Sequence, residues 1–255
     1  MSTLLPTQGM EDDVLHVAVE AVLPESATFE PVTAPVPVVG KALRTRSEEF
    51  DASFTHGTGA VAAVLGGLYL VAESLEYRDP LCSIGCLLYA VALVGVLSCS
   101  TLSHLYLPEH LNRRFRAYDQ GFIYLLAAGS LSPFALTYLR TPFWLTFYAL
   151  SVLLAFAGFV SKICFTHRVD KISLWFYLIL GWGQAIALVP LLSILPDAAV
   201  AWILAGAMFY SVGVVFLVMD RRRFHFHTIW HLFVLAACGC HYYAILRYVV
   251  HGQLV

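Results

Sequence analysis

The sequence predicts an all-α integral membrane protein, a bundle of seven transmembrane helices with its N-terminus in the cytoplasm and its C-terminus outside. Three observations carry this prediction. Of the 255 residues, 59% are apolar and only 13% are charged, whereas an ordinary soluble domain is about one quarter charged. Apolar blocks of about twenty residues, the length of a helix that crosses a bilayer, recur along the chain. The basic residues are distributed unevenly between the loops that connect these blocks.

The first fifty residues differ in kind from the rest, because they intersperse acidic residues with prolines. This composition predicts a mostly disordered tail over residues 1–50. A basic start followed by a short apolar core and a small-residue cleavage site is not evident, so we expect no removable signal peptide. The predicted organisation is this tail, a seven-helix transmembrane domain over 51–250 and a short C-terminal tail over 251–255.

Seven windows are apolar and long enough to span a membrane as helices. They cover residues 54–74, 81–105, 118–139, 143–165, 173–193, 199–219 and 227–249. The connections between them are short, so neighbouring helices should run in alternating directions. Pro133 and Pro190 lie inside the third and fifth windows, where a proline removes a backbone hydrogen bond and should bend the helix. Prolines and small residues there can open a cavity or permit close helix packing, and we favour packing.

The basic residues give these helices a direction. Alternating crossings place twelve of the fifteen Lys and Arg residues on one side. These are Lys41, Arg44, Arg46, Arg113, Arg114, Arg116, Lys162, Arg168, Lys171, Arg221, Arg222 and Arg223, against Arg78, Arg140 and Arg247 on the other side. The positive-inside rule therefore predicts a cytoplasmic N-terminus. We expect a multi-pass protein of the plasma membrane or a bacterial inner membrane, with lipids as partners; a net charge of −2 gives no indication of nucleic-acid binding.

Polar residues of the second, third and seventh predicted helices converge at one depth near the cytoplasmic face. Ser100 and His104 are spaced i, i+4, as are His227 and His231, so each pair shares a helix face. The rise of 1.5 Å per residue places His231 about 6 Å deeper than His227. Asp119 is the only carboxylate that the predicted spans place inside a helix away from the outer surface. Packing of these three helices would bring all five side chains together.

This set of residues favours a zinc site. Three neutral imidazoles with an open fourth position are the pattern of catalytic zinc, so we predict His104, His227 and His231 as ligands. Asp119 and Ser100 would supply charge and hydrogen bonds around the ion. Each element also has a simpler explanation when taken alone. The histidines could be ordinary interfacial side chains, Ser100 could bond the preceding turn, and Asp119 could favour a helix N-terminus.

Two further histidines and the cysteines are not assigned to the metal. His241 lies about 15 Å beyond His231, so we expect a bundle-facing hydrogen-bond partner or, alternatively, a residue of a substrate cavity. His56, in "FTHGTG", could reach the region of the site, although a structural role at the interface is favoured. The six cysteines lie in or beside apolar stretches, where thiols act as small hydrophobic groups; we expect no disulfides.

Three stretches carry a family resemblance: "SCSTLSH" at the end of the second helix, "DQGFIYLLAAGSLSPF" starting at Asp119, and "HTIWHLFVLAACGCHYYAILRY" in the seventh helix. Together they resemble the hemolysin III-like branch of the progestin and adiponectin receptor family, in a superfamily shared with alkaline ceramidases. The resemblance covers about residues 48–250. It implies a seven-helix bundle with an intramembrane zinc ion held by the histidines that match the three named above. It also implies metal-dependent hydrolysis of lipid amides. Ser103 departs from the pattern, because the family often has an aromatic residue there, and the acidic tail has no counterpart.

The leading functional hypothesis is a zinc-dependent hydrolase of a lipid amide, with a ceramide-like substrate that reaches the site from the bilayer. In this hypothesis Asp119 is the general base and Ser100 donates a hydrogen bond to the water or to the developing oxyanion. A second hypothesis is a receptor or sensor in which zinc only braces the helices. A third, a pore-forming or lytic protein, rests on the family label alone, because no predicted span shows a continuous polar stripe.

Overall fold

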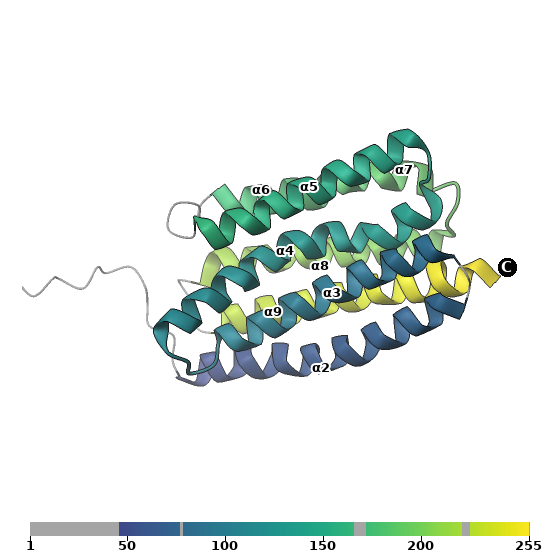
Figure 1. The fold of residues 1–255 in the computed structure, drawn as a ribbon. Coiled ribbons are helices and arrows are strands. Elements are labelled where there is room, and N and C mark those ends of the chain that lie inside the picture. Colours follow the sequence, from purple (N-terminus) through teal and green to yellow (C-terminus); the bar gives the residue numbers. More distant parts are fainter. Residues whose placement is uncertain (1–45, 77–78, 166–171, 221–224, 255) are drawn as a thin grey trace, which may run out of the picture. The chain divides into compact units, whose positions relative to one another are not determined.

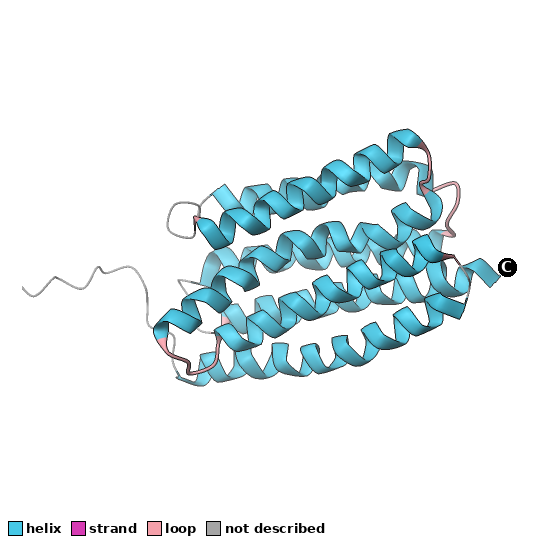
Figure 2. Cartoon of the chain, in the orientation of Figure 1, coloured by secondary structure: helices cyan, strands magenta, loops and turns pink. Residues whose placement is uncertain are grey.

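The computed structural model describes residues 46–76, 79–165, 172–220 and 225–254, and most of the predicted N-terminal tail lies outside these ranges. Within them the chain forms helices joined by short loops and contains no strand (Figure 2). The predicted all-α class is therefore confirmed for the part of the chain that is described.

The helices follow one another in the order shown in Figure 1. They are α2 (Arg46–Glu76), α3 (Pro80–Ser103), α4 (Glu109–Tyr138), α5 (Pro142–Cys164), α6 (Ile172–Gly183), the 3₁₀ helix η1 (Gln184–Ala187), α7 (Leu188–Leu191), α8 (Asp197–Met219), α9 (Phe226–Ile245), the π-helix η3 (Leu246–Val250) and the 3₁₀ helix η4 (His251–Leu254). Helical structure thus continues into the stretch predicted as a C-terminal tail. Its first residue, His251, lies 3.0 Å from a carboxylate oxygen of Glu73.

Six of the described helical segments are long and apolar enough to cross a membrane. They are α2, α3, α4, α5, α8 and the continuous run Phe226–Val250. Large apolar side chains cover their outer surface, and Leu65 and Leu68, for example, are 65% and 67% exposed. A surface of this kind is stable against acyl chains rather than water. These features are those of a multi-pass integral membrane protein.

The fifth predicted span is helical but interrupted. The structure divides it into α6, η1 and α7, and its apolar part, Phe176–Leu191, is shorter than the other spans. Pro190 accounts for the break, because a proline has no backbone donor and its ring collides with the carbonyl of the residue four positions earlier, here Ile186. That residue lies inside the 3₁₀ segment. The predicted effect of Pro190 is therefore confirmed, and six long spans with one broken segment replace seven uniform helices.

Two helices begin well before the windows that predicted them. α2 starts at Arg46 instead of residue 54, and α4 starts at Glu109 instead of residue 118. Hydropathy windows miss the first turns of these two helices because the residues there are polar. A helix can still include such residues where its backbone and side-chain polar groups find hydrogen-bond partners. In α2 the acidic first turn has such partners: a carboxylate oxygen of Glu48 accepts the backbone N–H of His225 at 2.9 Å.

The helices pack as an ordered bundle around a core in which α3 is central. α3 contacts both α2 and α4, α2 also contacts α9, and α4 and α9 contact α5 and α8 respectively. Gly85 allows α3 and α4 to approach most closely, because a Cβ atom there would lie 2.8 Å from both the Pro133 Cα and the Ser132 carbonyl oxygen. The small residue and the proline thus serve helix packing, as the sequence indicated.

Replacing Gly85 with alanine should therefore destabilise the protein. The new methyl group meets backbone that cannot rotate away, so α3 and α4 must separate, at a cost of about 1–3 kcal/mol. Gly239→Ala is the matched control, since nothing lies within 4 Å of its Cβ position and alanine is intrinsically favoured over glycine in a helix. Thermal unfolding in detergent should show a lower midpoint for Gly85→Ala only. Equal midpoints for the two variants would contradict the close approach.

The ends of five helices meet at one end of the bundle. Figure 1 shows the start of α2 and the end of α3 near the starts of α4 and α9. α8 also ends there, at Met219, since Asp220 lies 3.4 Å from His227 of α9. This is the end that carries the predicted site residues.

Candidate metal centre

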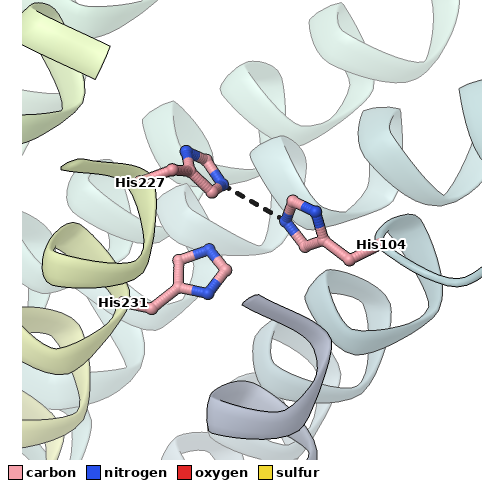
Figure 3. A group of neighbouring side chains, drawn as sticks. All are labelled: His104, His227 and His231. Atoms are coloured by element: carbon pink, nitrogen blue, oxygen red, sulfur yellow. Dashed lines mark hydrogen bonds between the residues drawn. The ribbon is translucent and has the colours of Figure 1, made fainter. Parts of the chain in front are cut away.

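Three histidines from two helices form a compact cluster. His104 is the residue that caps the C-terminus of α3, and His227 and His231 lie in the first two turns of α9. One ring nitrogen of each lies within 4.8 Å of the corresponding nitrogens of the other two. The Nε2 atoms of His104 and His227 are 3.2 Å apart. Figure 3 shows the three rings facing a shared space. The structure thus brings together all three predicted ligands.

The second nitrogen of each ring faces an oxygen atom outside the cluster. The Nδ1–H of His104 donates to a carboxylate oxygen of Glu49 at 2.7 Å. The Nδ1 of His231 lies 3.2 Å from the backbone carbonyl oxygen of Ala52, and that of His227 lies 3.4 Å from a carboxylate oxygen of Asp220. A neutral imidazole that donates through Nδ1 keeps a lone pair on Nε2. Donation through Nδ1 to these oxygens favours a free lone pair on Nε2, and with this tautomer at all three rings the lone pairs would face the shared space and could bind a cation.

This donor set fits a metal ion. Neutral imidazoles bind zinc and other borderline cations, and metal-binding histidines almost always donate their other N–H to a carboxylate or carbonyl. Ligand nitrogens of a tetrahedral ion with bonds of about 2 Å lie roughly 3.3 Å apart, close to the spacing of His104 and His227. The two nearby carboxylates, Glu49 and Asp220, offset the positive charge of a cation. The cluster can therefore hold a metal ion.

A second hydrogen-bonded group adjoins the cluster. The Oγ of Ser100, one turn before His104 on α3, lies 2.7 Å from Nδ1 of His56, and the Ser100 side chain also interacts with the carboxyl group of Asp119. The ring of His56 stacks on that of His231, with centroids 3.6 Å apart. His56, Ser100, His104 and His231 are all buried, and Asp119 is half-buried. The predicted residue Ser100 thus lies beside the cluster, bonded to His56, and Asp119 lies close to Ser100.

Within the described chain, one polar atom of this group has no hydrogen-bond partner. It is the buried Nε2 of His56. Burying a polar group without a hydrogen-bond partner lowers the stability of the folded protein by about 1–3 kcal/mol. This cost indicates that the Nε2 of His56 has a partner in the functional state. A substrate or water molecule at the site could provide the missing partner.

Two carboxylates that lie near the cluster fall outside the predicted spans. Glu49 lies in the first turn of α2, which the predicted span did not include, and Asp220 immediately follows the last residue of α8. The sequence left open whether His56 reaches the site, and the structure stacks its ring on that of His231. A signal was present in the sequence: Glu49, Ala52 and His56 are spaced i, i+3 and i+7, so they share a helix face if the helix is extended backwards.

His241 does not join the cluster. Its Nε2 lies 3.3 Å from the carbonyl oxygen of Ile203 on α8, and its ring packs over Gly206. The prediction of a bundle-facing hydrogen-bond partner is confirmed. The six cysteines are free thiols.

Removing the carboxylate of Glu49 should weaken metal binding while leaving the ligands in place. Loss of such a partner typically costs 10–100-fold in metal affinity, and we expect this range for Glu49→Ala. Glu48→Ala is the matched control, because Glu48 belongs to the same turn but accepts the backbone N–H of His225. Competition with a zinc-sensitive chromophoric chelator measures both affinities. An unchanged affinity in Glu49→Ala would show that His104 needs no such partner.

Comparison with known proteins places the chain among described relatives. Residues 44–242 match the family described as "Haemolysin-III related". Hemolysin-3 of Bacillus cereus is 33% identical over 203 residues, which cover 80% of this chain and 92% of that protein. The Hemolysin-3 homolog of Bacillus subtilis (strain 168) is 30% identical, covering 81% and 96%. The human Monocyte to macrophage differentiation factor is 28% identical, covering 84% and 89%. No solved structure matches the chain.

Proposed function

The chain belongs to the haemolysin-III-related family of membrane proteins, and from this premise we propose that it is a zinc-dependent hydrolase of a lipid amide with a ceramide-like substrate. The observation that supports the proposal best is the cluster of three imidazoles with the carboxylate of Asp119 nearby. Asp119 is not one of the three clustered residues. A metal held only to brace helices needs no such carboxylate. Hydrolysis needs a base.

Zinc is the proposed metal because three imidazole ligands leave a fourth coordination position open, as in catalytic zinc sites. His104, His227 and His231 would hold it. When bound, zinc would lower the pKa of a water molecule toward 7 and polarise the carbonyl group of the substrate.

Asp119 is the proposed general base. It takes a proton from the attacking water as the water oxygen bonds to the amide carbon, and it returns a proton to the nitrogen as the carbon–nitrogen bond breaks. The products are a fatty acid and an amine. The half-buried position of Asp119 beside the cluster suits this exchange.

Ser100 is proposed as a positioning residue, which revises the oxyanion role expected from the sequence. An ionised carboxylate can only accept hydrogen bonds, and a serine hydroxyl has one proton. If Asp119 is ionised, Ser100 donates to it and accepts from the Nδ1–H of His56. The Ser100 proton is then engaged in holding Asp119, and the Nε2 of His56 is the atom left to contact substrate or water.

The site is proposed to lie near the cytoplasmic face of the membrane. This orientation follows from the excess of Lys and Arg on the loops at that end. The plasma membrane or a bacterial inner membrane is the proposed location.

The test is turnover of lipid amides by purified protein. Zinc-loaded protein in mixed micelles should release fatty acid from ceramide or an N-acylethanolamine. Chelation should stop the release, and added zinc should restore it. Absence of release from every amide tested, with zinc bound, would overturn the hydrolase proposal.

One observation favours a second candidate, a receptor or sensor with a structural metal. The ligands come from α3 and α9 and their outward nitrogens face α2 and the end of α8, so a bound ion would tie four helices together. This candidate predicts that chelation lowers the thermal midpoint while no lipid amide is hydrolysed. The turnover experiment separates the two.

A further inference from the structure

A pocket of about 390 Å³ adjoins the candidate metal centre on the outside of the bundle. One wall is a single stripe of α2 that begins at Phe50 and ends at Val61, with lining residues at helical spacings of three and four. The other wall is the turn after α3, from His104 to Tyr106. A residue of the histidine cluster therefore forms part of the pocket wall.

The pocket opens onto the surface that faces lipid. Phe54, Val61 and Tyr106, which all line it, are 61%, 63% and 67% exposed. Phe54 and Val61 belong to α2 and Tyr106 to the turn that follows α3, and both helices are long enough to span a bilayer. Acyl chains are the groups available to such a surface inside a membrane. Charged or strongly polar ligands would have to leave water to reach it.

The two ends of the pocket differ in polarity. At the end near the start of α2, the hydroxyl of Tyr106 donates to the backbone carbonyl of Arg46 at 3.4 Å, and the Arg46 guanidinium lies 5.2 Å from the centre of the Tyr106 ring. Tyrosine and arginine side chains with an apolar body and a polar tip are typical of the lipid headgroup region. Val61 lies eleven residues beyond Phe50, about 16 Å along the helix toward the hydrocarbon core.

Gly57 is a small residue within the wall that α2 contributes to the pocket. It lines the pocket at the middle of the α2 stripe, and the group nearest to its Cβ position is the side chain of Thr101, at 3.4 Å. The rings of Phe50 and Phe54 stack with centroids 6.1 Å apart, and both line the pocket on the same helix. A mainly apolar pocket of about 390 Å³ whose lining follows one helix can accommodate an extended hydrocarbon chain.

We propose that this pocket binds the acyl chain of a membrane lipid amide and thereby presents the amide, at the polar end, to the histidine cluster. That the bound lipid is an amide rests on the proposed function, whereas binding of an acyl chain in the pocket does not. The amide of such a lipid lies where the headgroup meets the chain, which is the depth at which His104 forms the pocket wall.

Photolabelling tests the pocket independently of catalysis. The probe is a ceramide with a diazirine at the end of its acyl chain, incorporated in phosphatidylcholine vesicles with the full-length protein. The labelled residues, located by mass spectrometry, should lie on the α2 stripe at its Val61 end, away from the polar end of the pocket. An excess of unlabelled ceramide should compete with the label.

A matched pair of tryptophan substitutions sharpens the test. Thr58 lines the pocket and is exposed, so Thr58→Trp should fill the pocket without disturbing the core. Leu65 is also exposed and lies one turn beyond Val61, outside the lining, so Leu65→Trp is the control. Loss of about two buried methylene groups weakens binding about tenfold. We therefore expect labelling of α2 to fall about tenfold or more in Thr58→Trp and to stay unchanged in Leu65→Trp.

The outcomes separate this proposal from the proposed activity. Labelling elsewhere, or equal labelling of the two variants, overturns the pocket even if the protein hydrolyses ceramide. Labelling as expected without hydrolysis of any amide supports the pocket and overturns the hydrolase. If both hold, Thr58→Trp should also raise KM for long-chain amides about tenfold, with less effect on amides too short to pass Thr58.

Discussion

Replacing His227 with alanine is expected to abolish stoichiometric zinc binding by the purified protein. The wild-type protein should retain one zinc ion per chain after dialysis, measured by elemental analysis. The variant would keep only two of the three clustered imidazoles and should lose more affinity than the 10–100-fold that follows loss of an outer partner. Asp220 would also lose the ring that it faces at 3.4 Å.

His241→Ala is the matched control for this experiment. It removes a second imidazole from α9, one that lies against the carbonyl of Ile203 instead of the cluster. Zinc content should remain at one per chain in His241→Ala, although its stability can fall. Equal zinc content in wild type and His227→Ala would exclude the cluster as the metal site, and so would the absence of zinc from both.

Zinc binding should also raise thermal stability. A ligand that binds only the folded state at one hundred times its Kd stabilises that state by about 2.7 kcal/mol. The thermal midpoint of the wild type should therefore rise with free zinc, and that of His227→Ala should respond much less. This measurement gives a readout that does not depend on catalysis.

Replacing Asp119 with asparagine is expected to remove most of the lipid amide hydrolysis without removing the metal. Asparagine has nearly the same shape and can still accept a hydrogen bond from Ser100, but it cannot take a proton from water. A positioned general base typically contributes 10²–10⁴-fold, so kcat should fall by about that factor. Zinc content should stay at one per chain.

Glu109→Gln provides the control for Asp119→Asn. It neutralises a carboxylate of the same helix, α4, whose side chain is exposed and lies 3.9 Å from Arg113. Its turnover should equal that of the wild type. Wild-type turnover in Asp119→Asn would show that Asp119 is not the base, and simultaneous loss of zinc and turnover would indicate that Asp119 helps to hold the metal.

Much of the fold could be predicted because the membrane restricts it so strongly. A chain that crosses hydrocarbon must satisfy its backbone hydrogen bonds internally, so apolar windows of spanning length predict helices. Five of the seven windows match long continuous helices, and the last matches α9 with the π-helical segment after it, whereas the window that contains Pro190 is broken. The proline itself was the signal for that break.

The histidine cluster could be predicted because depth along a helix follows from residue count. Ser100 and His104 near the end of one helix, and His227 and His231 at the start of another, had to lie at a similar level. The outer oxygen partners could not be found in this way. Glu49 and Asp220 lie beyond the apolar windows, and the contact of His231 with the Ala52 carbonyl depends on how α2 packs against α9.

The position of the cluster along the chain has a consequence for biosynthesis. His104 is synthesised early, but His227 and His231 belong to the last long helix. A nascent chain, or one truncated before α9, carries a single imidazole of the three and cannot acquire the ion at this place. A metal ion held by all three rings could therefore bind only after insertion of the final helix, and bound metal would then report that membrane assembly is complete.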